Sequence, residues 1–221
     1  MGQSVLTTSQ KKLLGIISED AYLTKQFFLT GGTALSEFYF QHRFSEDFDL
    51  FSETEFDTRK IISWVKKTKS LLGFDRVEQQ SLSGQETFFF YTKPKEFVKV
   101  DFAYFPFQHL GEFKKYNKLN ISSVEDICIN KIHAITTRKR SRDYFDLFFC
   151  IPHLGWNTND IIKNYRLKFD VSISTEQLAV SFANVLDTQD EPRFLGNVDW
   201  EEVKNYFLGL AKELKNEIIT K

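Results

Sequence analysis

Two aspartates separated by a single residue, Asp47 and Asp49, stand in a short stretch whose other side chains are mostly apolar. Side chains two positions apart on a β-strand point to the same face, so the two carboxylates are expected to project side by side. Neighbouring carboxylates repel unless a cation lies between them, and hard oxygen ligands suit Mg²⁺. The spacing therefore favours a magnesium site over its alternative, a polar strand edge that faces solvent.

A third aspartate, Asp101, stands inside the strongly β-like run 97–105. A buried carboxylate without a partner is costly, so Asp101 should face a positive charge. Lys99 lies on the same strand face and can supply that charge. The other candidate is a metal ion held by Asp47 and Asp49, and the strand pattern by itself leaves both open.

Two adjacent glycines, Gly31 and Gly32, follow an apolar run over 27–29 and precede a predicted helix over 33–43. Glycines let the backbone approach a ligand closely, and the first turn of a helix offers free N–H groups to phosphate. The pattern is typical of a phosphate-binding turn. Taken alone, it is more often an ordinary joint between a strand and a helix.

The second half of the chain carries a lysine inside an apolar stripe. On a helical wheel the arc of Lys131 is shared by Ile127, Ala134, Ile135 and Arg138. A lysine in such a place needs an anion nearby, and Asp146, in a helix that is apolar nearly all round, is expected to be buried. Ion pairs of Lys131 with Asp146, or of Arg138 with Asp143, could join two helices. Alternatively, the cations could face the phosphates of an NTP.

The elements that must position these residues change in kind about half-way along the chain. Helices are expected over 8–22, 33–43 and 57–72, and strands over 27–29, 47–51, 74–80, 86–92 and 96–105. After Pro106 the strand signals end, and helices are expected over 122–138, 141–150, 157–168, 174–186 and 198–219. The sequence thus predicts an α/β (α+β) fold, with a mixed-sheet core over 1–108 and a helical region over 109–221.

Composition narrows the class further. The chain has 221 residues, of which 42% are hydrophobic and 27% charged, as in an ordinary globular protein. Its net charge of -1 does not indicate a nucleic-acid binder, although it leaves room for a local basic patch. Cys128 and Cys150 have no metal-type or disulfide spacing. No apolar run suits a signal peptide or a membrane span, so we expect a cytoplasmic protein without a membrane partner.

Taken in order, the motifs resemble those of the AbiEii/AbiGii toxin family. They read Gly31-Gly32-Thr33-Ala34-Leu35, Arg43-x-Ser45-x-Asp47-x-Asp49-Leu50, Lys131-x-x-Ala134-x-x-x-Arg138 and Arg142-Asp143-Tyr144-Phe145-Asp146-Leu147. The similarity covers roughly residues 20–150. Thr33 stands where the family commonly has serine, which keeps the hydroxyl, and 151–221 is short beside many members and matches no motif of theirs.

The resemblance implies a DNA polymerase β-like nucleotidyltransferase, the toxin half of a toxin–antitoxin or phage-defence pair. Such an enzyme moves NMP from an NTP to an acceptor hydroxyl, here a tRNA 3′ end or another cellular target, and has a cognate antitoxin protein. Asp47, Asp49 and, from the general polymerase β-like pattern, Asp101 would hold two Mg²⁺ ions. Lys131 and Asp146 carry over as catalytic residues, and Asp143 competes with Asp146 for its role.

The resemblance also implies a nucleotide-binding set, namely Gly31, Gly32, Thr33, Arg43, Ser45 and Arg138. In it the glycine amides and the Thr33 hydroxyl cradle the departing phosphates, and Lys131, with Arg43 or Arg138, adds positive charge. Two other functions stay open: transfer to a small-molecule acceptor, as in aminoglycoside-modifying enzymes, and nucleotide binding without catalysis. An exposed basic groove would favour RNA as acceptor, and an acidic pocket would favour a small molecule. Three retained carboxylates argue against lost catalysis.

Overall fold

The computed structural model describes residues 4–190 and 194–219, which form two compact units. The sheet unit comprises the chain up to Gln41 together with Ser45–Phe107 and Glu112–Ser122. The helical unit comprises His42–Phe44, Gln108–Gly111 and the described chain from Ser123 onward. The two units are therefore not continuous in sequence, because His42–Phe44 and Gln108–Gly111 belong to the helical unit although segments of the sheet unit flank them.

The sheet unit alternates helices and strands. In chain order these are α1 (Thr8–Ile17), α2 (Ala21–Gln26), β1 (Phe28–Thr30), α3 (Gly31–Leu35), the π-helix η1 (Ser36–Phe40), β2 (Asp47–Ser52), α4 (Thr58–Leu72), β3 (Arg76–Leu82), β4 (Gln85–Lys93), β5 (Glu96–Tyr104), β6 (Lys114–Tyr116) and β7 (Leu119–Ile121). The described strands form one sheet of seven in the order β3-β4-β5-β2-β1-β7-β6. Strand β2 runs parallel to β5 and β1 parallel to β7, and the other neighbours are antiparallel. The predicted mixed sheet is confirmed.

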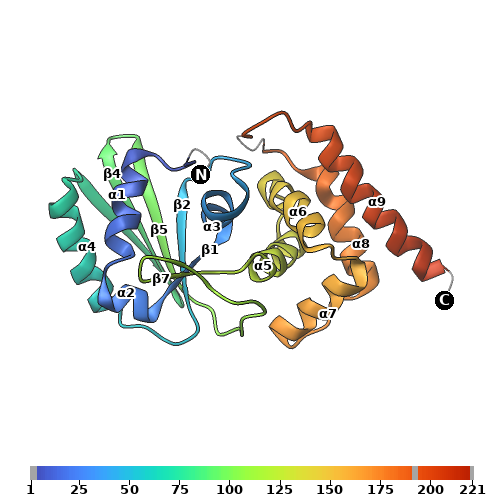
Figure 1. The fold of residues 1–221 in the computed structure, drawn as a ribbon, viewed down its shortest axis with the longest axis horizontal. Coiled ribbons are helices and arrows are strands. Elements are labelled where there is room, and N and C mark those ends of the chain that lie inside the picture. Colours follow the sequence, from blue (N-terminus) through green and yellow to red (C-terminus); the bar gives the residue numbers. More distant parts are fainter. Residues whose placement is uncertain (1–3, 191–193, 220–221) are drawn as a thin grey trace. The chain divides into compact units, whose positions relative to one another are not determined.

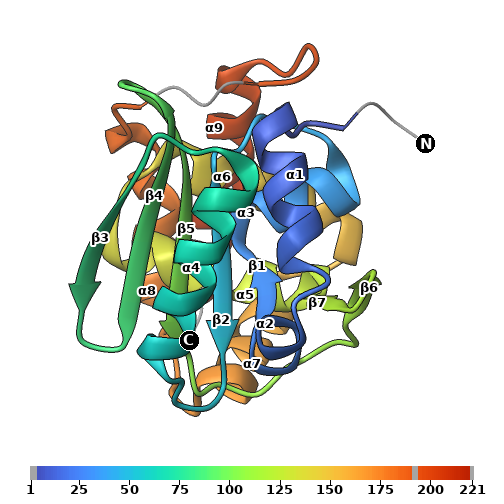
Figure 2. The same cartoon turned by 90° about the vertical axis from the view of Figure 1, so that its left-hand side faces the viewer.

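Helices cover both faces of this sheet. Helices α1, α2 and α4 lie against one face, and α3 lies against the other, beside β1 and β2 (Figures 1 and 2). Phe102 of β5 shows why the first face is stable, because its ring lies 5.1 Å from that of Phe27 and 6.0 Å from those of Trp64 and Phe88. Aromatic packing of this kind fixes the sheet beneath α4.

The predicted helix over 33–43 begins two residues earlier and ends three residues earlier in the structure. Gly31 adopts φ +74°, a conformation that glycine reaches without a steric penalty, so the chain turns directly from β1 into α3. The glycines thus lie in the first turn of the helix and not ahead of it. The helix widens to π geometry over Ser36–Phe40 and stops where Gln41 turns left-handed at φ 52°.

The prediction that strands end at Pro106 was wrong. Strands β6 and β7 follow it, joined at Asn117, whose φ is 50°. Each has three residues, too few to show an alternating pattern, and β7 is held by its pairing with β1 from far along the chain. The predicted division at residue 108 therefore falls ahead of two strands that belong to the sheet unit.

The helical unit contains α5 (Val124–Thr137), α6 (Ser141–Leu154), α7 (Thr158–Phe169), α8 (Thr175–Ala183), the 3-10 turn η2 (Asn184–Asp187) and α9 (Trp200–Ile219). Its core joins α6, α8 and α9: the ring of Phe207 lies 5.2 Å from Tyr144 and 5.6 Å from Phe182. The helices predicted from 122 onward are confirmed with shifts of a few residues at their ends. Within the described residues, no helix combines the length and apolar composition that crossing a membrane requires.

Candidate active site

The register of β2 against β5 gathers the three aspartates. Asp49 pairs directly with Asp101, and Asp47 pairs with Lys99, so all four side chains share one face of the sheet. Along β2 the aspartates are half-buried and alternate with the buried Phe48 and Leu50, as the spacing predicted. This is the face on which α3 lies (Figure 1).

An ammonium group lies among these carboxylates. Lys99 Nζ contacts Asp101 Oδ2 and lies 3.6 Å from Asp47 Oδ2. Burial opposes its charge, but the hydrogen bond to Asp101 and the charges of Asp47, Asp101 and Asp49 outweigh burial and raise the pKa of Lys99. Lys99 is thus one partner of Asp101 in this structure, which is the simpler of the two sequence alternatives.

The other oxygen of Asp101 is fixed by strand β4. Asp101 Oδ1 accepts hydrogen bonds from the hydroxyl of Thr87 and from Gln85 Nε2, the latter at 3.2 Å. Thr87 stands directly opposite Asp101 in the pairing of β4 with β5. Asp101 is only 4% exposed, so these donors determine which way its carboxylate faces. Oδ2 is left to face the cation.

The donor set fits a hard divalent cation. Within residues 4–190 and 194–219, no three His, Cys, Asp or Glu side chains are already spaced as metal ligands. Two of the three carboxylates nevertheless converge on a single positive charge, that of Lys99, and all the donor atoms are oxygens. Magnesium in this place would have to displace the ammonium group and draw the carboxylates closer.

Gly31 lies hard against one of the aspartates. A Cβ atom built on Gly31 would lie 2.0 Å from Asp49 Oδ2, far inside van der Waals contact. Together with the positive φ, this approach explains why the position needs glycine. The predicted phosphate turn and the predicted metal ligands thus meet on the same face of the sheet.

Thr33 and Ser45, both predicted to bind nucleotide, hold the beginning of β2. The Thr33 hydroxyl hydrogen-bonds the carbonyl oxygen of Asp47 and lies 2.8 Å from the hydroxyl of Ser45. Thr33 is completely buried. Its side chain therefore positions Asp47, and what Thr33 can offer a nucleotide is its backbone.

In the helical unit, Asp146 is the fully buried centre of an ionic cluster. Arg43 donates two hydrogen bonds to it, from Nε to Oδ1 at 2.6 Å and from Nη2 to Oδ2 at 2.9 Å, and Lys131 Nζ lies 2.7 Å from Oδ2. His42 Nε2 lies 2.8 Å from Oδ1. Burial opposes the charge of Asp146, but Arg43 and Lys131 outweigh burial and hold its pKa well below the usual range. Asp146 is an ionised anchor for three side chains.

Asp143 is the second buried anion of this cluster. Lys131 Nζ lies 2.6 Å from its Oδ1, and Arg138 Nε lies 2.7 Å from its Oδ2. Burial opposes the charge of Lys131, yet Asp146 and Asp143 outweigh it and raise the pKa of the ammonium group. Lys131 therefore bridges Asp143 and Asp146. The ion pairs that the sequence offered as an alternative are present, and both aspartates share this one lysine.

His42 and Thr87 did not emerge from the sequence. Pairing the predicted strands 86–92 and 96–105 as a hairpin would have placed Thr87 opposite Asp101. No sequence signal could have placed His42 beside Asp146, which lies 104 positions away. Contacts of that range are fixed by tertiary packing.

Comparison with known proteins defines the class. A candidate nucleotidyltransferase of Helicobacter pylori shares the fold with a TM-score of 0.64 and 18% identity, covering 97% of this chain and 98% of that one. JHP933 from Helicobacter pylori gives 0.62 and 18%, covering 96% and 93%. An uncharacterised protein of Aquifex aeolicus (strain VF5) is 30% identical over 204 residues, 86% of this chain and 89% of its own length.

The fold is thus one that a candidate nucleotidyltransferase also has, and the site on it is a face of converging carboxylates. Residues 13–214 match the family described as nucleotidyl transferase AbiEii toxin, type IV TA system. The chain belongs to this AbiEii family of nucleotidyltransferase toxins, and it is an enzyme of the nucleotidyltransferase type.

The contact of Gly31 with Asp49 generates a first prediction. Gly31→Ala should lower the free energy of unfolding by about 2–4 kcal/mol, because it adds a clash to the strain of a positive φ. Gly84→Ala is the matched control: Gly84 has φ +76°, but a Cβ there meets only Tyr104 Cβ at 3.8 Å. Urea unfolding of both variants measures the difference, and equal losses would show that the Asp49 contact adds nothing. Adding Asp49→Ala to Gly31→Ala should recover part of the loss.

The buried cluster generates a second prediction. Asp146→Asn should lower the free energy of unfolding at pH 7 by about 3–5 kcal/mol, because Arg43 and Lys131 lose a buried counter-charge. Lys131→Met should cost less, because the bidentate Arg43–Asp146 and Arg138–Asp143 pairs stay balanced. Urea unfolding of the two variants gives both values, and a larger loss for Lys131→Met would contradict this order.

The same cluster determines the response to acid. The folded-state pKa values of Asp143 and Asp146 are depressed, so their contribution is complete above the unfolded value of about 3.9 and is lost as pH falls below it. Wild-type stability should therefore fall steeply below about pH 4. Asp146→Asn should show a shallower fall, although Asp126, whose pKa is also lowered, leaves a residual slope.

Proposed function

We propose that this enzyme transfers NMP from an NTP to an acceptor hydroxyl with Mg²⁺ held by Asp47, Asp49 and Asp101. The observation that supports this proposal most is the register that sets Asp49 opposite Asp101 on the face where Asp47 also lies. The ammonium group of Lys99 lies between two of these carboxylates, which is consistent with a face that attracts positive charge. Membership of a nucleotidyltransferase family supplies the reaction type.

Each carboxylate has its own part in this proposal. Bound magnesium, two ions in the full reaction, would supply positive charge that offsets the negative charge developing on the phosphates. Asp47, Asp49 and Asp101 would hold it, Asp47 and Asp101 through the oxygens that face Lys99 in this structure. Asp101 or Asp49 polarises the acceptor hydroxyl, and Thr87 keeps the Asp101 carboxylate oriented while it does so.

The nucleotide phosphates are proposed to bind where α3 begins. The first N–H groups of a helix have no partner within the helix. Gly31 and Gly32 add no side chain of their own there, and the side chain that lies against Gly31 is that of Asp49. In the helical unit, Lys131, Arg43 and Arg138 outnumber their two aspartates by one positive charge. All three side chains are therefore proposed to offset part of the negative charge of the nucleotide phosphates. Their carboxylate partners also give them a structural role.

The acceptor is proposed to be RNA, a tRNA 3′ end or another cellular hydroxyl, modified in the cytoplasm. The type IV toxin family supports the role of toxin and a cognate antitoxin protein as partner. A small-molecule acceptor and a catalytically inactive nucleotide-binding module are the alternatives. The direct test is to incubate the protein with each labelled NTP, Mg²⁺ and total RNA. Label in RNA supports the proposal, and label in no acceptor contradicts it.

The metal assignment generates a third prediction. Asp47→Asn should reduce nucleotide transfer by about 100-fold or more, because one ligand of the proposed metal loses its charge. The fold should survive, because a repulsive carboxylate pair has been relieved. Asp75→Asn, the same change at an exposed position of the sheet unit, is the control and should transfer normally. Full activity of Asp47→Asn would refute the metal site.

The position of Lys99 generates a fourth prediction. Lys99→Met should tighten Mn²⁺ or Mg²⁺ binding by about tenfold in the absence of NTP, because the ion no longer competes with an ammonium group. Without metal the variant should be less stable than wild type, because Asp101 loses its cation. Calorimetric titration with Mn²⁺ measures the first effect, and Lys93→Met, an exposed lysine paired with Glu96, is the control. Weaker metal binding would mean that Lys99 organises the ligands and does not compete.

A further inference from the structure

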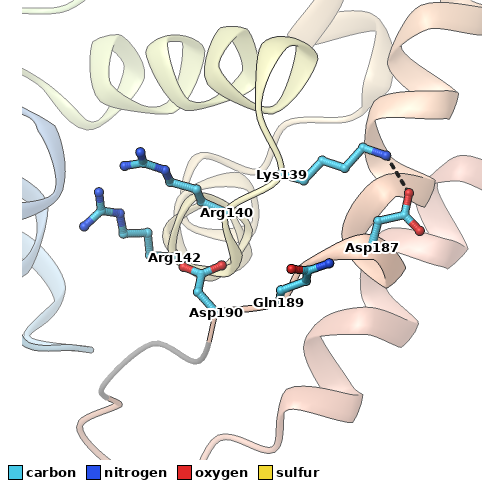
Figure 3. Close-up of a pocket in the computed structure, with 6 residues that line it drawn as sticks. All are labelled: Lys139, Arg140, Arg142, Asp187, Gln189 and Asp190. Atoms are coloured by element: carbon cyan, nitrogen blue, oxygen red, sulfur yellow. Dashed lines mark hydrogen bonds and ion pairs between the residues drawn. The ribbon is translucent and has the colours of Figure 1, made fainter.

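The connection between α5 and α6 concentrates positive charge on the helical unit. Four of the five residues over 138–142 are cationic. Three of them, Lys139, Arg140 and Arg142, line a hollow of about 520 Å³ together with Asp187, Gln189 and Asp190 (Figure 3). A chain of net charge -1 thus carries a local basic surface.

Two of these cations already have partners. Arg138 is held by Asp143, and Lys139 Nζ lies 2.6 Å from Asp187 Oδ2. Asp190 is also engaged, because its Oδ1 accepts a hydrogen bond from the backbone N–H of Ser141 at 2.8 Å. Within the described residues, neither acid of the hollow has an ion pair with the two remaining arginines, and the three cations of the lining outnumber its two carboxylates by one.

Arg140 and Arg142 have no hydrogen bond or ion pair to any other residue that the structure describes. Their guanidinium groups extend to the same side, away from Lys139 (Figure 3). Arg140 is exposed and Arg142 is half-buried, so both groups can meet a ligand from solvent. The two guanidinium groups, which have no partner among the described residues, thus line one hollow and can both face an anion that comes from solvent.

The chemistry of the hollow indicates the kind of anion. A guanidinium presents paired N–H donors that match the oxygens of a phosphate. The described lining contains no aromatic or aliphatic side chain on which a base could stack. The two arginines and this lining favour contact with the phosphate backbone of a nucleic acid over stacking of its bases.

We propose that Arg140 and Arg142 bind backbone phosphates of the RNA acceptor, without regard to its sequence. This inference rests on the proposed function, because the acceptor there is RNA. The triphosphate of an NTP offers the same phosphate chemistry from another source. RNA is favoured because a run of cations beside an open hollow suits successive phosphates of a strand, and the described lining has no aromatic side chain on which the base of a nucleotide could stack.

The test measures RNA binding apart from catalysis. The Arg140→Gln/Arg142→Gln variant and wild type are titrated, without metal or NTP, into a labelled single-stranded RNA of mixed sequence at several salt concentrations. The variant should bind about tenfold more weakly, and the slope of log K against log salt should become less steep by about 1.4, or about 0.7 for each phosphate that the protein ceases to neutralise. Its melting temperature should equal that of wild type, because neither guanidinium has a partner in the described protein.

A control with the same loss of charge excludes a general electrostatic effect. Arg59→Gln/Arg76→Gln removes two exposed arginines of the sheet unit, each paired with a neighbouring acid. This variant should keep the wild-type salt slope. If it lost as much slope as Arg140→Gln/Arg142→Gln, or if the latter bound RNA as wild type does, the inference would be overturned.

Two further measurements separate the sources of phosphate and the two proposals. ATP titration should give the same affinity for wild type and Arg140→Gln/Arg142→Gln, and a lower affinity in the variant would assign the pair to the nucleotide and overturn the inference. Asp47→Asn should bind RNA normally while it fails to transfer. Unchanged RNA binding by the arginine variant would thus remove the phosphate site alone, whereas the absence of label in RNA after incubation with the wild-type protein would remove the proposed function.

Discussion

The site depends on bringing like charges together, and the opposite face of the sheet makes this possible. Phe48, Leu50, Val100 and Phe102 are completely buried beneath the helices, and they alternate with the residues of the charged face. Because side chains alternate along a strand, a slip of one residue would turn the aspartates into the core and the aromatic rings out. The hydrophobic face therefore determines the register, and the register places Asp49 against Asp101. The repulsion that follows is offset by Lys99, which is why one cation is built into the strand itself.

What the sequence could predict follows from the same periodicity. The shared face of Asp47 and Asp49 is a property of alternation within one strand, so it was accessible without coordinates. The partner of Asp101 was not, because Lys99 and a metal ion satisfied the pattern equally, and the contact of Lys99 Nζ with Asp101 Oδ2 depends on how the two side chains are oriented. The strands β6 and β7 were not predicted for a related reason: β7 is held by pairing with β1 and β6 by pairing with β7, and three residues are too few to show an alternating pattern. The cluster around Asp146 could be predicted only in part. Lys131 and Asp146 stand out as charged residues in apolar helices, but the contacts of His42 and Arg43 could not be predicted, because these residues lie more than a hundred positions earlier in the chain.

The cationic residues of the helical unit fall into two groups with different physical tasks. Lys131, Arg43 and Arg138 are tied to buried or nearly buried carboxylates, and part of their charge serves to hold the helices together. Arg140 and Arg142 stand two and four positions beyond Arg138 and have no such tie in the described chain. The basic residues of this unit thus divide into those that hold it together and those without a carboxylate partner among the described residues. The sequence could not make this division, because the buried carboxylates that separate the two groups are placed by tertiary packing.

The closeness of Gly31 to Asp49 also has a consequence for descent. A side chain at position 31 is excluded as long as the carboxylate is present, whereas a smaller residue at position 49 opens the space. The order of mutational steps is therefore biased: a side chain at position 31 costs less after position 49 has lost its carboxylate than before, although the positive φ still disfavours it. Among relatives, a glycine kept beside an intact aspartate and a larger residue beside an altered one would form a correlated pair. The residues that a relative has at these two positions would therefore indicate whether its carboxylate was lost before the glycine was replaced.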